Sequence, residues 1–74
     1  MATFHFLTGF LKDVVRDANE IKKAGVKCTD IVSRDICETD TGKTVLTCYD
    51  LTFEGNIFQI HKAKKIARSL KHEE

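Results

Sequence analysis

The fold is decided by the stretch Thr44–Phe53, which reads Thr-Val-Leu-Thr-Cys-Tyr-Asp-Leu-Thr-Phe. It is rich in β-branched and aromatic residues, which favour strands. The turn residues Asp40-Thr41-Gly42-Lys43 precede it, and Glu54-Gly55-Asn56 follows it, with Gly-Asn suited to a two-residue hairpin loop. We therefore predict that this stretch is the middle strand of a three-stranded antiparallel meander.

The apolar pattern chooses the register of that sheet, because a slip of one residue would move every side chain to the other face. If Thr39 pairs with Thr44 and Glu54 pairs with Ile57, the apolar residues of all three strands share one face. Those residues are Val32, Ile36, Val45, Tyr49, Leu51, Phe53, Phe58 and Ile60. The opposite face, which includes Cys37 and Cys48, is then mostly polar.

A helical pattern precedes the sheet. Apolar residues recur on one stripe up to Ala24, and Gly25 supplies a stop signal. The helix begins at about Thr3 or Thr8. In the second case, Thr3–Leu7 forms a short strand before the helix.

The length of this first helix decides whether an interface is expected. A helix from Thr3 has an apolar arc of roughly 180°, wider than the ~100° stripe of an ordinary surface helix. Phe6 and Phe10 lie at one edge of the arc. We therefore expect a homodimer or a hydrophobic partner interface at these two residues, with a closely packed monomer core as the alternative.

The period becomes helical again from Ile60, and this second helix is basic. The segment from Ile57 to His72 contains five cations and no acid, although the whole chain has a formal charge of only +1. The cations are Lys62, Lys64, Lys65, Arg68 and Lys71. The three lysines at 62, 64 and 65 fall in the first turns of this helix, where its dipole disfavours positive charge. Two interpretations follow: a contact with phosphates or an acidic protein, or a solvated face balanced by the acidic hairpins.

These elements predict an α+β fold of order α-β-β-β-α, in which residues 1–74 form one domain. Two helices pack on one face of the meander. The run His61-Lys62-Ala63-Lys64-Lys65-Ile66-Ala67 is similar to the lysine-alanine helix start of the double-stranded RNA-binding domain, and the element order resembles that family. The glycine-proline loop with a histidine of that family is replaced here by Asp40–Lys43, which removes one contact with duplex RNA. The resemblance therefore implies a shared architecture.

Three cysteines, at positions 28, 37 and 48, show no metal-ligand spacing and no C-x-x-C motif. We expect all three to be reduced and packed as small hydrophobic residues. No apolar stretch approaches the roughly 18 residues of a membrane span, and the N-terminus lacks the positive region of a signal peptide. We therefore expect a cytoplasmic protein without a membrane partner.

The motifs of known catalytic sites are missing from the sequence: there is no Gly-rich phosphate loop, no paired-carboxylate spacing and no nucleophile elbow. We expect no enzyme, no cofactor and no metal. The main hypothesis is a small interaction protein of the regulator or inhibitor type that docks on a macromolecule, with a protein as the first candidate. The alternative is a nucleic-acid-binding protein that contacts phosphates through the basic helix, although such domains usually carry a basic excess.

Overall fold

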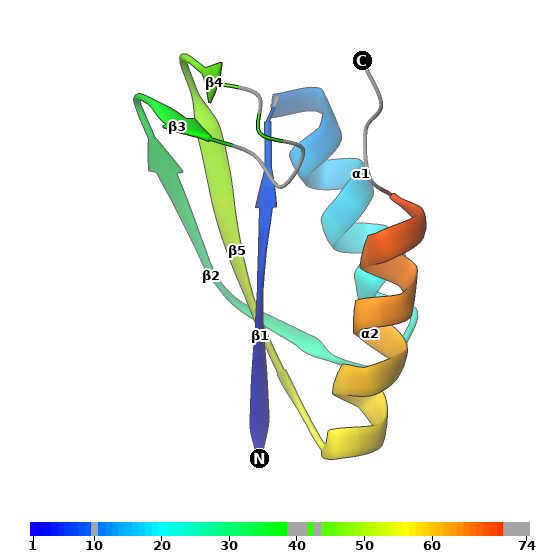
Figure 1. The fold of residues 1–74 in the computed structure, drawn as a ribbon. Helices are drawn as coiled ribbons and strands as arrows, with labels where there is room; N and C mark the ends of the chain where they lie inside the picture. The colour runs from blue at the N-terminus through cyan, green and yellow to red at the C-terminus, as the bar shows by residue number, and fades with distance from the viewer. Residues whose placement is uncertain (10, 39–41, 43, 71–74) are drawn as a thin grey trace.

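A computed structural model describes residues 1–9, 11–38, 42 and 44–70 of the chain, and Figure 1 shows the path of its elements. In these residues, two helices and five strands follow one another in the order β1, α1, β2, β3, β4, β5, α2. Their bounds are β1 Ala2–Thr8, α1 Leu11–Lys22, β2 Lys27–Arg34, β3 Cys37–Glu38, β4 Thr44–Val45, β5 Cys48–Gly55 and α2 Ile57–Ser69.

The main sheet has the strand order β1-β5-β2, and β5 is antiparallel to both neighbours. Helix α1 connects the two outer strands, which run parallel to each other, while β3 and β4 form a separate small hairpin between β2 and β5. The predicted α+β class and the three-stranded antiparallel sheet are confirmed. The α-β-β-β-α order and the meander are wrong, and the architectural resemblance to the double-stranded RNA-binding domain fails with them.

The N-terminal segment is strand β1, as in the alternative that placed a strand before the first helix. Phe4 lies opposite Phe53 and Phe6 lies opposite Leu51 in the ladder with β5. The rings of Phe4 and Phe53 are stacked, with centroids 6.2 Å apart. The alternating apolar side chains of β1 therefore belong to a strand. The helix does not begin at Thr3, so the wide apolar arc expected for such a helix is not formed.

The segment expected to form the third strand is instead the start of α2. The side chain of Asn56 accepts a hydrogen bond from the Gln59 backbone N–H, and the Gln59 side chain accepts one from the Asn56 backbone N–H. This capping box satisfies two donors that a helix start otherwise leaves unpaired. The predicted hairpin at Gly55–Asn56 is therefore wrong, and the place of the third strand is taken by β1.

The register of β2 against β5 is shifted by one residue from the expected one. Ile31, not Val32, lies opposite the buried Leu51, and Val32 lies opposite Asp50. In the β3–β4 hairpin, Glu38 pairs with Thr44, so residues 39–43 connect the strands instead of the expected 40–43. The apolar pattern could not select this register, because β2 is exposed on both faces and register is weakly specified in such strands.

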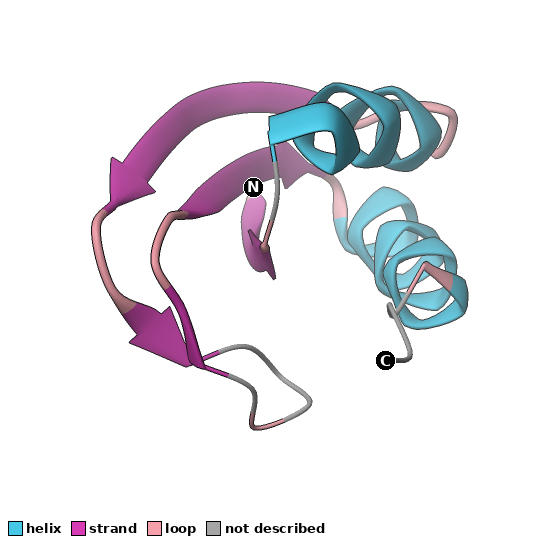
Figure 2. Ribbon diagram, turned by 90° about the horizontal axis from the view of Figure 1, so that it is seen from above, coloured by secondary structure: helices cyan, strands magenta, loops and turns pink. Residues whose placement is uncertain are grey.

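Both helices pack on one face of the main sheet, as predicted, and the core lies between these two layers (Figure 2). The side chains of Leu51 and Phe53 of β5 and of Ile21 of α1 are fully buried. Burial of each of these side chains stabilises the folded state by about 1.5–3 kcal/mol. The other core residues are Phe6, Val14, Ala18, Ala24, Val26, Ile60, Ala63 and Ala67. Tyr49, which shares this face as predicted, is half-buried at its margin.

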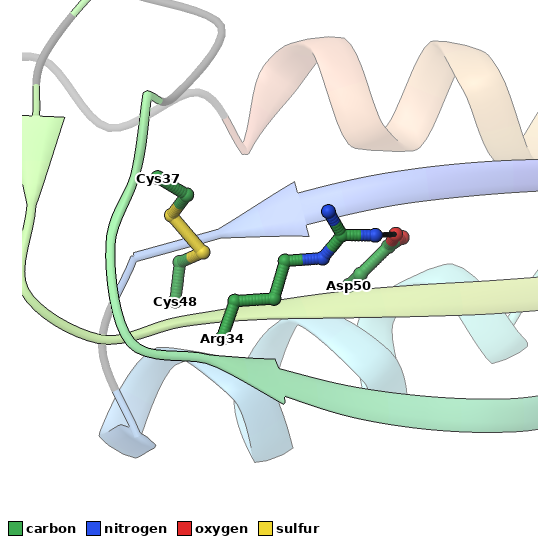
Figure 3. The surroundings of a disulfide bond; sticks show 4 residues. All are labelled: Arg34, Cys37, Cys48 and Asp50. Carbon is green, nitrogen blue, oxygen red and sulfur yellow. Dashed lines mark hydrogen bonds and ion pairs between the residues drawn. A yellow bond between two sulfur atoms is a disulfide. The ribbon is translucent and has the colours of Figure 1, made fainter.

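The hairpin of β3 and β4 is tied to the main sheet by a disulfide between Cys37 and Cys48 (Figure 3). The two Cα atoms are 6.3 Å apart, a separation typical of disulfides. Cys28 is a free thiol. The expectation of three reduced cysteines is therefore wrong for Cys37 and Cys48. The pairing of Arg34, the last residue of β2, with Cys48, the first residue of β5, brings Cys37 of β3 close to Cys48.

Candidate interaction surface

The solvent-facing side of α2 combines two exposed apolar residues with four cations. Ile57, Lys64 and Arg68 follow one line along the helix, and Phe58, Lys62 and Lys65 follow the adjacent line, because residues three or four apart share a face. The opposite side of the helix carries Ile60, Ala63 and Ala67, which enter the core. We call six of the exposed residues of α2 the α2 surface: Ile57, Phe58, Lys62, Lys64, Lys65 and Arg68.

The N-terminal end of the α2 surface is apolar. Phe58 is 83% exposed and Ile57 is 72% exposed, although both are large hydrophobic residues. Ile57 also lines a shallow, mainly apolar hollow of about 490 Å³ together with Met1, Ala2 and Asn56. Sequence reasoning missed this apolar end because it placed Phe58 on the buried face of a strand. The signal that could have found it is the capping pattern Asn56-x-x-Gln59.

The basic part of the α2 surface forms no ion pair with the acids in the described part of the chain. Among the described residues, no carboxylate lies within 4.0 Å of the cationic group of Lys62, Lys64, Lys65 or Arg68. Other cations of the chain do find acids: Lys23 Nζ lies 2.8 Å from Glu20 Oε1. The interpretation in which acidic hairpins neutralise the basic helix therefore has no support in the described part of the chain.

The position of the lysines along α2 changes one premise of their interpretation. Because the helix begins at Ile57, Lys62 lies in its second turn, and Lys64 and Lys65 come after it. The first turn carries no acid. The unfavourable interaction with the helix dipole is confined to the first turn. The expected repulsion between these lysines and the helix dipole is therefore absent, and the capping box already occupies the backbone N–H groups of Asn56 and Gln59.

The remaining predicted interface residues, Phe6, Phe10 and Lys71, do not join the α2 surface in the described structure. Phe6 is 6% exposed and belongs to the core, so its apolar surface is already covered within one copy of the chain. Phe10 and Lys71 lie outside the described residues. The observation that suggested an interface at the first helix, an apolar arc including Phe6, is thus removed.

The sheet face opposite the helices holds a second, more polar hollow of about 460 Å³. Its lining residues are His5, Leu7, Arg34, Ile36, Cys37, Glu38 and Asp50. Arg34 lies 3.4 Å from the Asp50 carboxylate, and Figure 3 shows this pair beside the disulfide. His5 Nδ1 and the Thr52 hydroxyl are 3.1 Å apart. Arg34 and Asp50 neutralise each other here, and no group of three metal-ligating side chains is found in residues 1–9, 11–38, 42 and 44–70.

Within the described ranges, no helix is both long enough and apolar enough to cross a membrane. Comparison with protein-family models, with curated proteins and with solved structures finds no match for the chain. The α2 surface is therefore interpreted from its own residues.

Proposed function

We propose that this chain is a small, non-enzymatic interaction protein that docks through the α2 surface on a protein partner. The observation that carries the proposal is the exposure of Phe58 and Ile57 directly beside four cations that have no acid partner among the described residues. A solvated face explains lysines, but it does not explain a large aromatic side chain that is almost fully exposed at the start of the same face.

The chemistry of the partner follows from the two parts of this surface. Aromatic anchors surrounded by charged residues are typical of binding hot spots. The partner should therefore offer an apolar depression for Phe58 and carboxylates for the lysines around it. Lysines at the rim of such a contact mainly accelerate association through long-range attraction. A regulatory or inhibitory role and a cytoplasmic location remain predictions. The Cys37–Cys48 disulfide argues against the cytoplasmic location, because disulfides are more usual in oxidising compartments.

A second candidate function is the binding of single-stranded nucleic acid, and Phe58 is the observation that favours it. Exposed aromatic side chains beside cations provide stacking platforms for bases, with the cations on phosphates. The formal net charge of +1 argues for the protein partner, because nucleic-acid-binding domains usually carry a basic excess.

The experiment compares four immobilised proteins in affinity capture from a lysate, with and without nuclease treatment. They are the wild type, the variant Phe58→Ser, a triple variant in which Lys62, Lys64 and Lys65 become Gln, and a control triple variant. The control changes Lys22, Lys23 and Lys27 to Gln and so removes the same charge from the segment between the end of α1 and the start of β2.

We expect proteins that bind the wild type and the control but are lost from both α2 variants. Identical capture by all four proteins would overturn the proposal. Binding partners that disappear after nuclease treatment, together with retention of the wild type on single-stranded DNA, would establish the nucleic-acid alternative instead.

A further inference from the structure

Strand β2 is an edge of the main sheet that the described parts of the chain leave open. Figure 1 shows β2 at the outer side of the sheet, with β5 on one side and no described element on the other. Seven of its eight residues are exposed, and Cys28 alone is half-buried. Ile31 and Val32 are 55% and 43% exposed, respectively, on the two faces of the strand.

The usual protections of an edge strand are few in β2. Natural edges are blunted by proline, by charged residues in the middle of the strand, by bulges or by short length. The strand has eight residues and no proline, and its bulge lies near its beginning, between Cys28 and Asp30. The regular part, Asp30–Arg34, thus offers free backbone donors and acceptors around two exposed apolar side chains.

The sequence of this segment is complementary to itself. Two copies of one strand that pair antiparallel across a two-fold axis must place residues of the same sheet face opposite each other. With Val32 on the axis, Val32 faces its own copy, Ile31 faces Ser33, and Asp30 faces Arg34. A register centred on Asp30 would bring two carboxylates together, and one centred on Ile31 would place Asp30 opposite Val32. Only the register centred on Val32 matches an acid with a base on each side of the axis.

We propose that a second copy of this chain pairs with β2 in this register. The joined sheet has six strands, and the helices of both copies lie on the same face because the axis is perpendicular to the sheet. Cross-strand pairs of opposite charge stabilise an antiparallel sheet, and the symmetry provides two of them. Arg34 already contacts Asp50 of its own chain and would lie between that carboxylate and Asp30 of the second copy.

The pairing leaves the α2 surface free. Helix α2 packs against α1, β1 and β5, and Figure 1 shows the arrowhead end of β2 on the far side of the sheet from α2. A dimer through β2 would therefore present two α2 surfaces at once, and a partner with two matching sites would gain avidity. This pairing does not depend on the function proposed for α2.

The first test uses charge reversal and sedimentation velocity. Asp30→Arg and Arg34→Asp are each expected to abolish the dimer of the wild type, because each puts like charges opposite one another twice. An equimolar mixture of the two variants restores both attractive pairs and should sediment as a dimer again. Val15→Lys, on the exposed side of α1, is the control and should dimerise as the wild type does. A wild type that stays monomeric at millimolar concentration, or a mixture that stays monomeric, would overturn the proposal.

The second test probes the register by crosslinking. Opposite Cα atoms in an antiparallel pair are about 4.5–5.5 Å apart, which is within reach of a disulfide. In a Cys28→Ser background, Val32→Cys should crosslink two copies at least tenfold faster than Ile31→Cys under mild oxidation. Equal rates, or a faster Ile31→Cys, would exclude the register centred on Val32. Circular dichroism of each variant shows whether its monomer is folded.

Discussion

Asn56 and Gln59 bind each other's backbone at the start of α2. The Asn56 Oδ1 atom accepts from the Gln59 N–H at 2.8 Å, and the Gln59 Oε1 atom accepts from the Asn56 N–H at 2.9 Å. This reciprocal contact turns the chain from β5 into a helix immediately after Gly55. It is the reason that Phe58 lies in solvent.

The first prediction concerns this cap. Asn56→Ala should lower the free energy of unfolding by about 1 kcal/mol, because the Gln59 N–H loses its acceptor. In a domain of this size, this corresponds to a fall in Tm of about 4–8 °C. Thermal unfolding followed by circular dichroism measures the shift. Asn56→Asp keeps an acceptor at the same position and should unfold close to the wild type; equal losses in both variants would contradict a capping role.

Gly55 gives a second prediction at the same corner. A Cβ atom at this position would lie 2.8 Å from Gln59 Oε1 and 3.1 Å from Val26 Cγ1. Gly55→Ala should therefore push the Gln59 side chain off the Asn56 N–H and cost at least as much stability as the loss of the cap. Combining Gly55→Ala with Gln59→Ala removes the clashing oxygen, so the double variant should lose less than the sum of the two single changes. Chemical denaturation of the four proteins tests this, and strict additivity would contradict the contact.

The third prediction concerns two phenylalanines that were expected the other way round, with Phe58 on the apolar face of the sheet and Phe6 at an interface. Phe6→Ala should destabilise the fold by about 3–5 kcal/mol, because Phe6 is buried in the core. Phe58→Ala should change stability by less than about 0.5 kcal/mol, since its side chain is exposed. Urea denaturation of both variants is the measurement. A large loss for Phe58→Ala would mean that this ring packs within the chain and is not available to a partner.

The fourth prediction concerns the buried carboxylate of Asp17. It accepts a hydrogen bond from the buried Thr8 hydroxyl at 3.1 Å and contacts the Arg16 guanidinium at 3.2 Å. Asp17→Ala should cost about 1–3 kcal/mol, because it leaves the Thr8 hydroxyl buried without this acceptor. Combining Thr8→Val with Asp17→Ala should recover part of that loss. If the double variant is no more stable than Asp17→Ala, the Thr8–Asp17 bond is not the cause.

The fifth prediction concerns the disulfide. Thiol titration of the denatured, unreduced protein should detect one thiol, from Cys28, and three after reduction. Replacing Cys37 and Cys48 together by Ser should lower stability by about 2–3 kcal/mol, the range for a short closed loop. Three thiols before reduction would instead restore the expectation of reduced cysteines.

Part of the fold could be predicted from the sequence because local signals agreed with it. The side of β5 that carries Leu51 and Phe53 was predicted correctly from its alternation, and Gly25 ends the first helical region with a positive φ of 88°. The order of elements could not be predicted, because a short apolar run such as Phe4–Leu7 fits both a helix and a strand. Tertiary pairing with β5 decides between them.

The candidate site was predicted only in its basic half. The cations of α2 stand out in the sequence, and the four in the described range are exposed as expected. Its apolar half was missed because Gly55–Asn56 fits a hairpin turn as well as a helix cap. The bond between Cys37 and Cys48 could not be deduced either, since three cysteines allow three different pairs and the spacing favours none of them.

The central position of β5 has a consequence for how the chain acquires its structure. During synthesis, β1, α1 and β2 all leave the ribosome before β5, the strand that pairs with both β1 and β2. Ala2 can therefore form its strand pair only after Gly55 has been synthesised. Chains dominated by such distant pairings fold slowly for their size. Until β5 arrives, β2 exposes both of its edges, so the nascent chain is most prone to aggregate at this stage. Truncated chains that end before Cys48 should therefore remain unfolded, however well their helix forms.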